Sequence, residues 1–525
     1  MLRYEHDHLS SDVIAHNARL YCDKTAVVCG DRALTWGELN KRTNRVANAL
    51  RDLGYDKGDK IAVFMPNSLE SFELFWGVVK SGCVVVSLNT MLEGQALARL
   101  ANASDAQAIF VDESTRALID RQRGNLLNIP RHRFFTTGSV AEGWRSSEEF
   151  ITAASDTAPD VKIEPDDSMT IIFTSGTTGV PKGIEHSHFG RLNYPLGFGM
   201  GLSISRYSVA ICATPIYASG TWITMFPTMY RGGKVVLLEK YSPEAFLEAV
   251  EREGGTHSFL VPTQYIGLLQ HDLTKYDLST LQGLITAGQT LPEIIYNKLL
   301  NVFNHAKIYE VYGMTEGFAT LAIPGDIERG KRGTVGKASF LEDIRVIDSE
   351  GTELPHGQIG EIVAYGPGMM KGYYGRPDLT REATWIAPSG RTYLRSGDLG
   401  WMDEEGFLFV TGRLKDMIKS GGINIYASDL EGVLMQHEAV KEVAIVGIPH
   451  EKWSETPVAA VILKQGRTID AETLRNWANE RLSKYQRLSH LLIREDFPRA
   501  TYGKVQKTEL CNEVIAQLAR ERVET

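Results

Sequence analysis

Residues 174–183 read TSGTTGVPKG and combine hydroxyl side chains, glycines, a proline and a lysine within one short run. Glycine lets the backbone turn so that successive N–H groups can point at one anion, and the hydroxyls and the lysine would add further donors. The segment is not a Walker loop, because Lys182 is followed by Gly183 instead of a serine or threonine. Taken alone, a flexible turn would explain this composition equally well. The candidate phosphate ligands are Thr174, Ser175, Gly176, Thr177, Thr178, Gly179 and Lys182.

The residues around this loop predict a parallel α/β sheet. Residues 169–173 are apolar and β-favouring, so the loop should leave the end of a strand. Upstream, residues 60–65 and 84–88 predict two strands, and residues 69–80 between them predict an amphipathic helix. A strand–helix–strand unit of this length indicates parallel pairing. Further elements of the same kind are predicted over residues 36–53, 235–238, 243–253, 281–287 and 291–303.

The pattern changes after about Gly325, where short β-rich segments with acid–glycine turns take over. Towards the end of the chain, short strands again mix with helices. We therefore predict an α/β protein with two domains. Residues 1–414 form a large N-terminal domain of parallel and mixed sheets with helices and a β-rich subdomain, and residues 415–525 form a small α+β C-terminal lid domain.

The composition argues against several other classes of protein. A chain of 525 residues is too long for one hydrophobic core and should form at least two domains. Its net charge of −9 argues against nucleic acid as a partner. The apolar runs are far shorter than the ~20 residues of a membrane span, and the polar start of the chain is unlike a signal peptide. Five scattered cysteines without metal-type spacing indicate reduced thiols, so we expect a cytoplasmic protein.

Four further motifs follow the loop along the chain: YGMTE at 312–316, SGDLG at 396–400, GRLKD at 412–416 and GKVQK at 503–507. Together with the loop, and in this order, they resemble the adenylate-forming superfamily. This superfamily includes acyl- and aryl-CoA synthetases, adenylation domains of peptide synthetases and firefly luciferase. The resemblance extends from about Leu34 to Leu510 and implies that a carboxylic acid attacks the α-phosphate of ATP. Pyrophosphate then leaves, and the acyl group passes from the acyl-adenylate to coenzyme A.

This reaction needs groups that bind polyphosphate and Mg²⁺, hold the ribose and neutralise charge at the α-phosphate. In YGMTE, Glu316 offers a carboxylate oxygen to Mg²⁺, Thr315 a hydroxyl to a phosphate, and Tyr312 a flat ring to adenine. Asp398 can accept hydrogen bonds from both ribose hydroxyls, and Arg413 can reach the same sugar. Without the other motifs, these residues would be a strand-to-turn segment, a turn aspartate and a surface charge. The predicted nucleotide-binding residues beyond the loop are Gly288, Tyr312, Gly313, Thr315, Asp398 and Arg413.

Two lysines are expected to serve different half-reactions. By resemblance, Lys504 is carried into the site by the lid and meets the carboxylate and the α-phosphate, where a point charge on a long stem suits the developing charge. Lys419 belongs to the face of the lid that forms the thioester. The resemblance also places the hinge of the lid at Asp416. The expected coenzyme A contacts are Gly421, Gly422 and Trp453, although Trp453 could equally be a core or surface aromatic residue.

The identity of the acid is weakly specified. By resemblance, the acid pocket includes Tyr217, Ala218, Trp222 and Met314, whose small and apolar side chains suit an aryl or medium-length to long apolar acid. Ala218 stands where many relatives have a histidine that closes over the acid, so the usual gate on that side is in doubt. In the same region, Gln289 and Thr290 replace the common alanine and proline.

Other functions remain open at this point. The chain could load a carrier-protein pantetheine in trans instead of free coenzyme A, since no carrier domain follows GKVQKTEL. A luciferase-like oxygenase shares the adenylation step. From a different class, a nucleotide-binding regulatory protein would retain ATP binding without releasing pyrophosphate. The main prediction is an AMP-forming acid–CoA ligase that uses ATP, Mg²⁺ and coenzyme A; a homodimer is a further expectation.

Overall fold

The computed structural model describes residues 9–174, 182–289, 291–420, 423–499 and 505–524. By internal contacts the chain divides into two compact units, and each is described here by itself. Unit 1 comprises residues 1–343 and 364–394, and unit 2 comprises residues 344–363 and 395–525. The mixed α/β fold class that the sequence predicts is confirmed. The expected domain boundary after residue 414 stays a prediction.

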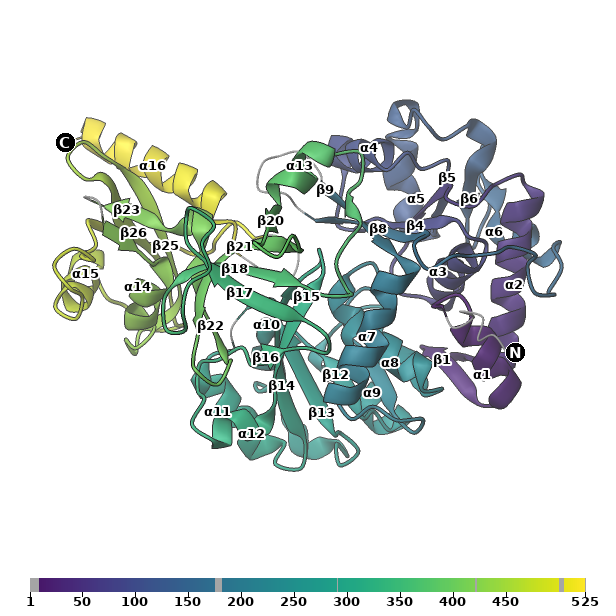
Figure 1. The fold of residues 1–525 in the computed structure, drawn as a ribbon, viewed down its shortest axis with the longest axis horizontal. Helices are drawn as coiled ribbons and strands as arrows, with labels where there is room; N and C mark the ends of the chain where they lie inside the picture. The colour runs from purple at the N-terminus through teal and green to yellow at the C-terminus, as the bar shows by residue number, and fades with distance from the viewer. Residues whose placement is uncertain (1–8, 175–181, 290, 421–422, 500–504, 525) are drawn as a thin grey trace. The chain divides into compact units, whose positions relative to one another are not determined.

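Unit 1 contains two large mixed sheets (Figure 1). The nine-stranded sheet has the order β16 (Lys337–Ala338), β15 (Phe318–Ala322), β14 (Lys307–Met314), β13 (Gly283–Ala287), β12 (His257–Phe259), β10 (Val209–Cys212), β11 (Lys234–Leu237), β1 (Thr25–Cys29) and β2 (Arg32–Thr35). The eight-stranded sheet has the order β19 (Gly372–Tyr373), β9 (Lys182–Ser187), β8 (Ser168–Thr174), β4 (Val84–Ser87), β3 (Lys60–Phe64), β5 (Ala108–Val111), β6 (Phe134–Thr136) and β7 (Arg145–Ser146). Strands β3 and β4 are parallel, as their sequence predicts.

The helices of unit 1 begin where the sequence supplies caps. The Thr35 side chain accepts a hydrogen bond from the backbone of Glu38, whose own side chain returns one, so α2 begins with a capping box. Ser68 caps α3 in the same way through Ser71. The helices are α1 (Val13–Leu20), α2 (Trp36–Asp52), α3 (Leu69–Lys80), α4 (Gly94–Ala103), α5 (Glu113–Asp120), α6 (Ser147–Thr152), α7 (His188–Gly201), α8 (Trp222–Tyr230), α9 (Pro243–Glu253), α10 (Pro262–Leu268), α11 (Glu293–Val302), α12 (Pro324–Glu328) and α13 (Pro377–Glu382).

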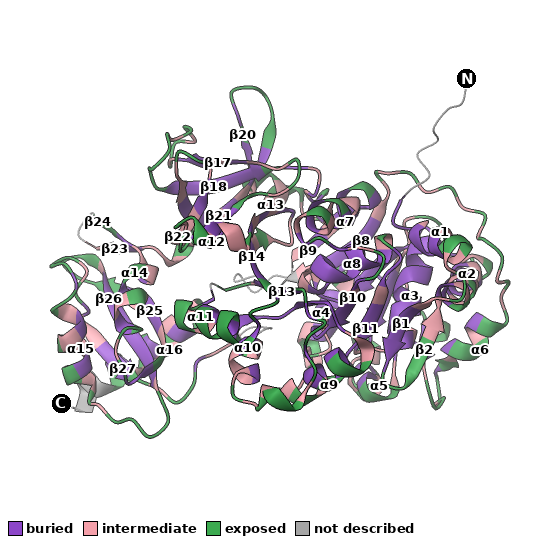
Figure 2. Ribbon diagram, turned by 90° about the horizontal axis from the view of Figure 1, so that it is seen from below, coloured by how far each residue is buried: buried purple, intermediate pink, exposed green. Residues whose placement is uncertain are grey.

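One hydrophobic core joins the two large sheets of unit 1. It takes buried residues from α1, α2, α3 and α8 and from strands of both sheets, such as Val235 of β11 and Val85 of β4. At its centre Trp222 stacks on Phe226 at 4.8 Å, and Trp76 of α3 lies 5.2 Å from the same ring. The strands that carry this core are almost continuously buried (Figure 2). Because helices of this shared core pack against both sheets, the ends of strands from different sheets are held in a fixed relation.

Unit 2 contains a smaller mixed sheet. Its order is β24 (Ile423–Ile425), β23 (Ile418–Ser420), β26 (Ser454–Leu463) and β25 (Val440–His450), with β27 (His490–Ile493) parallel to β26. The helices α14 (Ala427–Leu434), α15 (Ala471–Asn479) and α16 (Lys507–Glu524) contribute buried leucines and valines to two apolar clusters around it. Of the remaining strands, β20 (Thr384–Ile386) belongs to unit 1 and β22 (Leu408–Arg413) to unit 2, and the other three have residues in both: β17 (Asp343–Ile347), β18 (Gly360–Tyr365) and β21 (Thr392–Met402).

The structure bears on two sequence expectations, one about the cysteines and one about membrane-spanning helices. All five cysteines are free thiols, in agreement with the reduced state that we expected. Within the described part of the chain, no helix is both long enough and apolar enough to span a bilayer.

A half-buried acid in unit 1, Glu342, should make the stability depend on pH. Glu342 packs so closely on Gly366 that a Cβ there would lie 2.0 Å from its Oε2 atom, while Oε1 accepts a hydrogen bond from Asn193 at 3.2 Å. Burial raises the pKa of Glu342 to about 8. The unfolded chain therefore loses this proton near the ordinary pKa, whereas the folded chain keeps it until higher pH, so stability falls as pH rises between these values.

We expect Glu342→Gln to remove this dependence of the unfolding free energy on pH. Between about pH 5 and pH 8 the wild type should lose up to about 1.4 kcal/mol per pH unit relative to the variant, because the glutamine carries no titrating proton. Urea unfolding at several pH values measures the difference. Glu328→Gln, an exposed change in α12, is the control and should leave the slope unchanged. Parallel pH profiles of wild type and Glu342→Gln would contradict this account.

Candidate functional site

The strands that flank the predicted phosphate loop form an antiparallel pair. Thr174 ends β8 and lies opposite Lys182, which begins β9, so the two ends of the loop are adjacent in the sheet. The loop therefore leaves the end of a strand, as its sequence predicts. The ammonium of half-buried Lys182 lies 5.1 Å from the centre of the Tyr373 ring, within cation–π distance. The remaining loop candidates, Ser175, Gly176, Thr177, Thr178 and Gly179, lie outside the described residues.

The YGMTE motif forms the end of β14 and the turn to β15. Gly317 has a φ of +123°, and a Cβ at this position would lie 2.1 Å from the carbonyl oxygen of Gly368. This contact requires glycine, because any larger residue would push the two segments apart. The carbonyl of Glu316 accepts a hydrogen bond from the N–H of Met370 at 2.7 Å. The turn that carries the predicted metal ligand is thus packed directly against residues 368–370.

The side chains of Glu316 and Thr315 in this turn contact two other segments of unit 1. The hydroxyl of Tyr373 donates to Oε1 of Glu316 at 2.9 Å, and the Thr315 hydroxyl lies 3.0 Å from that of Ser219 in the 3-10 turn Ser219–Thr221. Burial raises the pKa of Tyr373, and the neighbouring Glu316 carboxylate raises it further. The phenol therefore stays protonated and acts as the donor. The structure thereby joins Lys182, Tyr373 and Glu316 in one chain of contacts.

The predicted adenine contacts occupy the ends of neighbouring strands. Tyr312 lies near the end of β14, and its ring meets Phe318 edge-on at 5.8 Å. Gly288 directly follows β13, which pairs in parallel with β14, and has a left-handed φ of +87°. At Gly313 a Cβ would lie 2.3 Å from the carbonyl oxygen of Phe318, so the hairpin requires glycine there too. Nucleotides commonly bind at the carboxyl ends of such parallel strands.

A carboxylate and a hydroxyl match what Mg²⁺ prefers, which is oxygen ligands. Among the residues that the structure describes, no group of three or more His, Cys, Asp or Glu side chains could hold a metal ion by itself. A magnesium ion that enters with ATP needs only one or two protein carboxylates, because the phosphates supply other ligands. Glu316, with Thr315 beside it, fits this arrangement. When bound, the ion would neutralise charge on the phosphates.

Two residues predicted to hold the ribose contact each other in unit 2. Asp398 of β21 lies opposite Arg413 of β22, and their side chains form an ion pair with Nε and Oδ1 at 2.6 Å. The Asp398 side chain is only 11% exposed, whereas Arg413 is 41% exposed. The sequence expectation named both residues but not their mutual contact. Because the two side chains already form an ion pair, a bound ribose would meet the carboxylate and the guanidinium together.

Two of the thioester candidates, Lys419 and Trp453, lie near each other where β23 pairs with β26. Lys419 lies in β23, and its backbone N–H donates to Oε2 of Glu455 at 2.7 Å. The next residue, Ser420, pairs with Ser454, which follows Trp453. Trp453 is 45% exposed, so its ring lies at the surface near β23. Lys504, Gly421 and Gly422 lie outside the described residues, and Asp416 ends the 3-10 turn Leu414–Asp416.

The predicted acid pocket divides into two kinds of residue. Tyr217 and Ala218 are buried beside Ser219, and therefore close to Thr315. Trp222 is fully buried; its indole N–H donates to the carbonyl of Ile216 at 2.8 Å and its ring stacks in the core. The structure thus gives Trp222 a packing role, and its place on the pocket wall stays a prediction, as does that of half-buried Met314.

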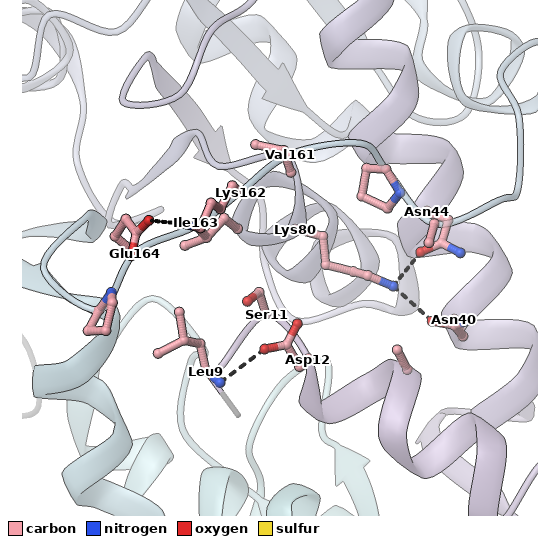
Figure 3. Close-up of a pocket in the computed structure, with 14 residues that line it drawn as sticks. Leu9, Ser11, Asp12, Asn40, Asn44, Lys80, Val161, Lys162, Ile163 and Glu164 are labelled. Atoms are coloured by element: carbon pink, nitrogen blue, oxygen red, sulfur yellow. Dashed lines mark hydrogen bonds and ion pairs between the residues drawn. The ribbon is translucent and has the colours of Figure 1, made fainter. Parts of the chain in front are cut away.

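A cavity of about 560 Å³ lies elsewhere in unit 1, against α1, α2, α3 and residues 158–165 (Figure 3). None of the motif residues that the structure describes lines it. Burial lowers the pKa of Lys80 in its wall to about 8. The ammonium donates to Asn40 Oδ1 at 2.8 Å, to Thr43 Oγ1 at 3.3 Å and to Asn44 Oδ1. These three acceptors match its three hydrogens, so Lys80 links α2 and α3 as a structural residue.

Known proteins resemble this chain over most of its length. The family model described as AMP-binding enzyme matches residues 14–374, and that described as AMP-binding enzyme C-terminal domain matches residues 429–504. A feruloyl-CoA synthase of Amycolatopsis is 33% identical over 499 residues, covering 94% of this chain and 96% of that protein. A long-chain-fatty-acid–CoA ligase of Mycobacterium tuberculosis is 29% identical, covering 91% and 93%. The crystal structure of ATP-bound MatB from Rhodopseudomonas palustris is similar with a TM-score of 0.85 at 28% identity, covering 96% and 98%.

The chain belongs to the AMP-binding enzyme family, as the resemblance implied. Within it, the chain is an ATP-dependent acid–CoA ligase of the AMP-forming class, with ATP, Mg²⁺ and coenzyme A as the expected small molecules.

Sequence reasoning missed Tyr373 as a neighbour of the site and did not predict that Ser219 contacts Thr315. Tyr373 is 57 positions from Glu316, and Ser219 is 96 positions from Thr315. The only sequence signal for Tyr373 is its place in GYY at 372–374, which names no partner. Contacts at such separations follow from the pairing of strands in different sheets and have no local signature.

We expect Gly317→Ala to disrupt the turn that carries Glu316. The new methyl group would collide with the Gly368 carbonyl and occupy an unfavourable backbone region, so a loss of several kcal/mol in unfolding free energy and of most ATP-dependent activity should follow. Urea unfolding and pyrophosphate release measure the two effects. Gly325→Ala in α12 is the control, because a Cβ there meets no atom within 4 Å. A fully active, stable Gly317→Ala protein would contradict this packing.

Proposed function

We propose that the protein activates an aryl or a medium-length to long apolar carboxylic acid with ATP and transfers the acyl group to free coenzyme A. The observation that carries the proposal is the chain of contacts from Lys182 through Tyr373 to Glu316. It brings the lysine at the end of the phosphate loop next to the predicted metal ligand. These two groups serve the same polyphosphate, one as a cation and the other through Mg²⁺.

The proposed chemistry has two steps. In the first, an oxygen of the substrate carboxylate attacks the α-phosphate, the bond to the β-phosphate breaks, and pyrophosphate leaves. Lys182 and the loop would hold the β- and γ-phosphates, and Lys504 would balance charge at the α-phosphate. In the second, the thiol sulfur of coenzyme A attacks the acyl carbonyl, the bond from the acyl carbon to AMP breaks, AMP leaves and the thiol proton is released to solvent. The Asp398–Arg413 pair would hold the ribose, and the edge formed by Lys419 and Trp453 would receive coenzyme A.

The assignment of an apolar acid rests on the residues near Thr315. Burial raises the pKa of Tyr217, so its phenol is neutral at physiological pH, and Ala218 is small and apolar. A second charge on the substrate would find no counter-ion in these side chains. The main alternative is transfer to the pantetheine of a carrier protein, which would use the same adenylation site.

Pyrophosphate release from ATP tests this proposal across aryl, short, medium-length and long acids, with and without coenzyme A. We expect release with one class of apolar acid, together with a coenzyme A thioester detected by mass spectrometry. Release without a thioester would favour a carrier protein or an oxidation as the second step. No release with any acid would count against the proposed activity.

We expect Lys504→Ala to abolish adenylation but to preserve thioester formation from supplied acyl-adenylate. The lost charge acts at the α-phosphate, so only the first half-reaction should fall, by a factor of about 10² to 10³. Single-turnover assays of each half-reaction separate the two. Lys507→Ala is a matched control three residues away, where the lysine pairs with Glu431 at 2.6 Å. Retained adenylation in Lys504→Ala would overturn the assignment.

We expect Lys419→Ala to slow thioester formation more than adenylation. The same two single-turnover assays measure it, with the exposed Lys441→Ala on the same unit as the control. Equal losses in both half-reactions would contradict the separate role of this face.

The finer points of organisation belong to the same proposal. We place the lid over residues 415–525 with its hinge at Asp416, and we place the protein in the cytoplasm, where its five free thiols would stay reduced. A homodimer is also proposed, and sedimentation velocity would test it.

A further inference from the structure

The hydroxyl of Tyr373 makes a polar contact that links β19 to the predicted metal ligand. It donates to Oε1 of Glu316 at 2.9 Å. Tyr373 is only 7% exposed, so this hydrogen bond lies largely out of water. A hydrogen bond to an ionised carboxylate is about twice as strong as one between neutral groups, and partial burial strengthens it.

We propose that Tyr373 is a positioning residue that holds the Glu316 carboxylate in the orientation in which it binds the magnesium ion of Mg–ATP. This inference rests on the proposed function, because it takes Glu316 as the metal ligand. Tyr373 itself contacts neither metal nor substrate in this account and acts only through Glu316.

The geometry of a carboxylate makes this role possible. Two carboxylate oxygens offer about four lone-pair directions, so a bond from Tyr373 to Oε1 leaves the group able to ligate a metal. A glutamate side chain otherwise rotates about three torsions, and fixing one oxygen restricts that motion. Removing a hydrogen bond to a metal-binding carboxylate commonly lowers metal affinity by about 10- to 100-fold. An ordinary tyrosine phenol is protonated at physiological pH and can therefore donate this hydrogen bond.

The position of Tyr373 is set by its backbone and not by its hydroxyl. Tyr373 pairs with Ile184 of β9, and its N–H donates to Oγ1 of Thr380 at 2.9 Å. The ring also supports the ammonium of Lys182 at 5.1 Å. A phenylalanine would keep the pairing, the N–H bond and the ring face. Tyr373→Phe therefore removes the bond to Glu316 and leaves the rest of the arrangement.

The adjacent tyrosine supplies a matched control. Tyr374 follows Tyr373 directly, its N–H donates to the carbonyl of Gly183 at 2.7 Å, and its ring lies 5.2 Å from the ammonium of Lys60. Its hydroxyl, however, donates to Asp105 at 3.0 Å. Tyr374→Phe is thus the same chemical change one residue away, with a partner that is not a predicted ligand.

The test measures how much Mg²⁺ improves ATP binding, independently of turnover. Isothermal titration calorimetry gives the Kd of ATP with Mg²⁺ and with EDTA, and the Kd of AMP, for wild type, Tyr373→Phe and Tyr374→Phe. We expect the gain in ATP affinity from Mg²⁺ to shrink by about 10-fold or more in Tyr373→Phe. The Kd of AMP, the Kd of ATP in EDTA and the Tm should stay as in wild type, and Tyr374→Phe should match wild type throughout.

Three outcomes would overturn the inference. The first is an unchanged gain from Mg²⁺ in Tyr373→Phe. The second is an equal weakening of AMP and Mg–ATP binding, which indicates a merely structural role. The third is a wild type that binds ATP equally with and without Mg²⁺, which would remove the metal role of Glu316 as well. By contrast, Mg²⁺-dependent ATP binding without ligation of any acid would count against the proposed function alone.

Discussion

The close approach of the β14–β15 turn to residues 368–370 is the constraint on which the rest of the site depends. The turn belongs to the nine-stranded sheet, whereas the segment after residues 368–370 enters the eight-stranded sheet as β19. Gly317 makes the approach possible, since a side chain at that position would collide with the Gly368 carbonyl. The Met370–Glu316 backbone bond then fixes the register between the two segments. The shared core holds the two sheets together, and this contact sets where the predicted metal ligand lies relative to the segment that leads into β19.

The site combines opposite charges across this junction. Lys182 is a cation at the end of the phosphate loop and Glu316 a carboxylate in the turn, and the Tyr373 ring and hydroxyl lie between them. A tyrosine suits this place because its ring face attracts a cation and its hydroxyl donates to an anion. Each group can therefore be held for its own ligand, a phosphate or Mg²⁺, without the two side chains neutralising each other in a direct ion pair.

In unit 2, the pairing of neighbouring strands brings the candidate residues together. Asp398 and Arg413 are opposite each other in the β21–β22 pair, so their contact follows from the register of two neighbouring strands. The register of β23 and β26 likewise brings Ser420 next to Ser454, and hence the Lys419 strand next to Trp453. In both cases a one-residue shift would turn one partner to the other face of the sheet.

The sequence by itself determined the local elements and the chemical class. The cap at Ser68 and the apolar period of residues 69–80 predict α3 with its observed bounds, because capping and periodicity act within a few residues. Five motifs in order identify the family for the same reason, since each motif is local. Only the tertiary structure decided that Tyr373 bonds Glu316, that Asp398 pairs with Arg413 and that Trp222 packs in the core. These contacts join residues that are distant in sequence or depend on which face a side chain takes, and strand pairing and core packing set both only when the whole chain folds.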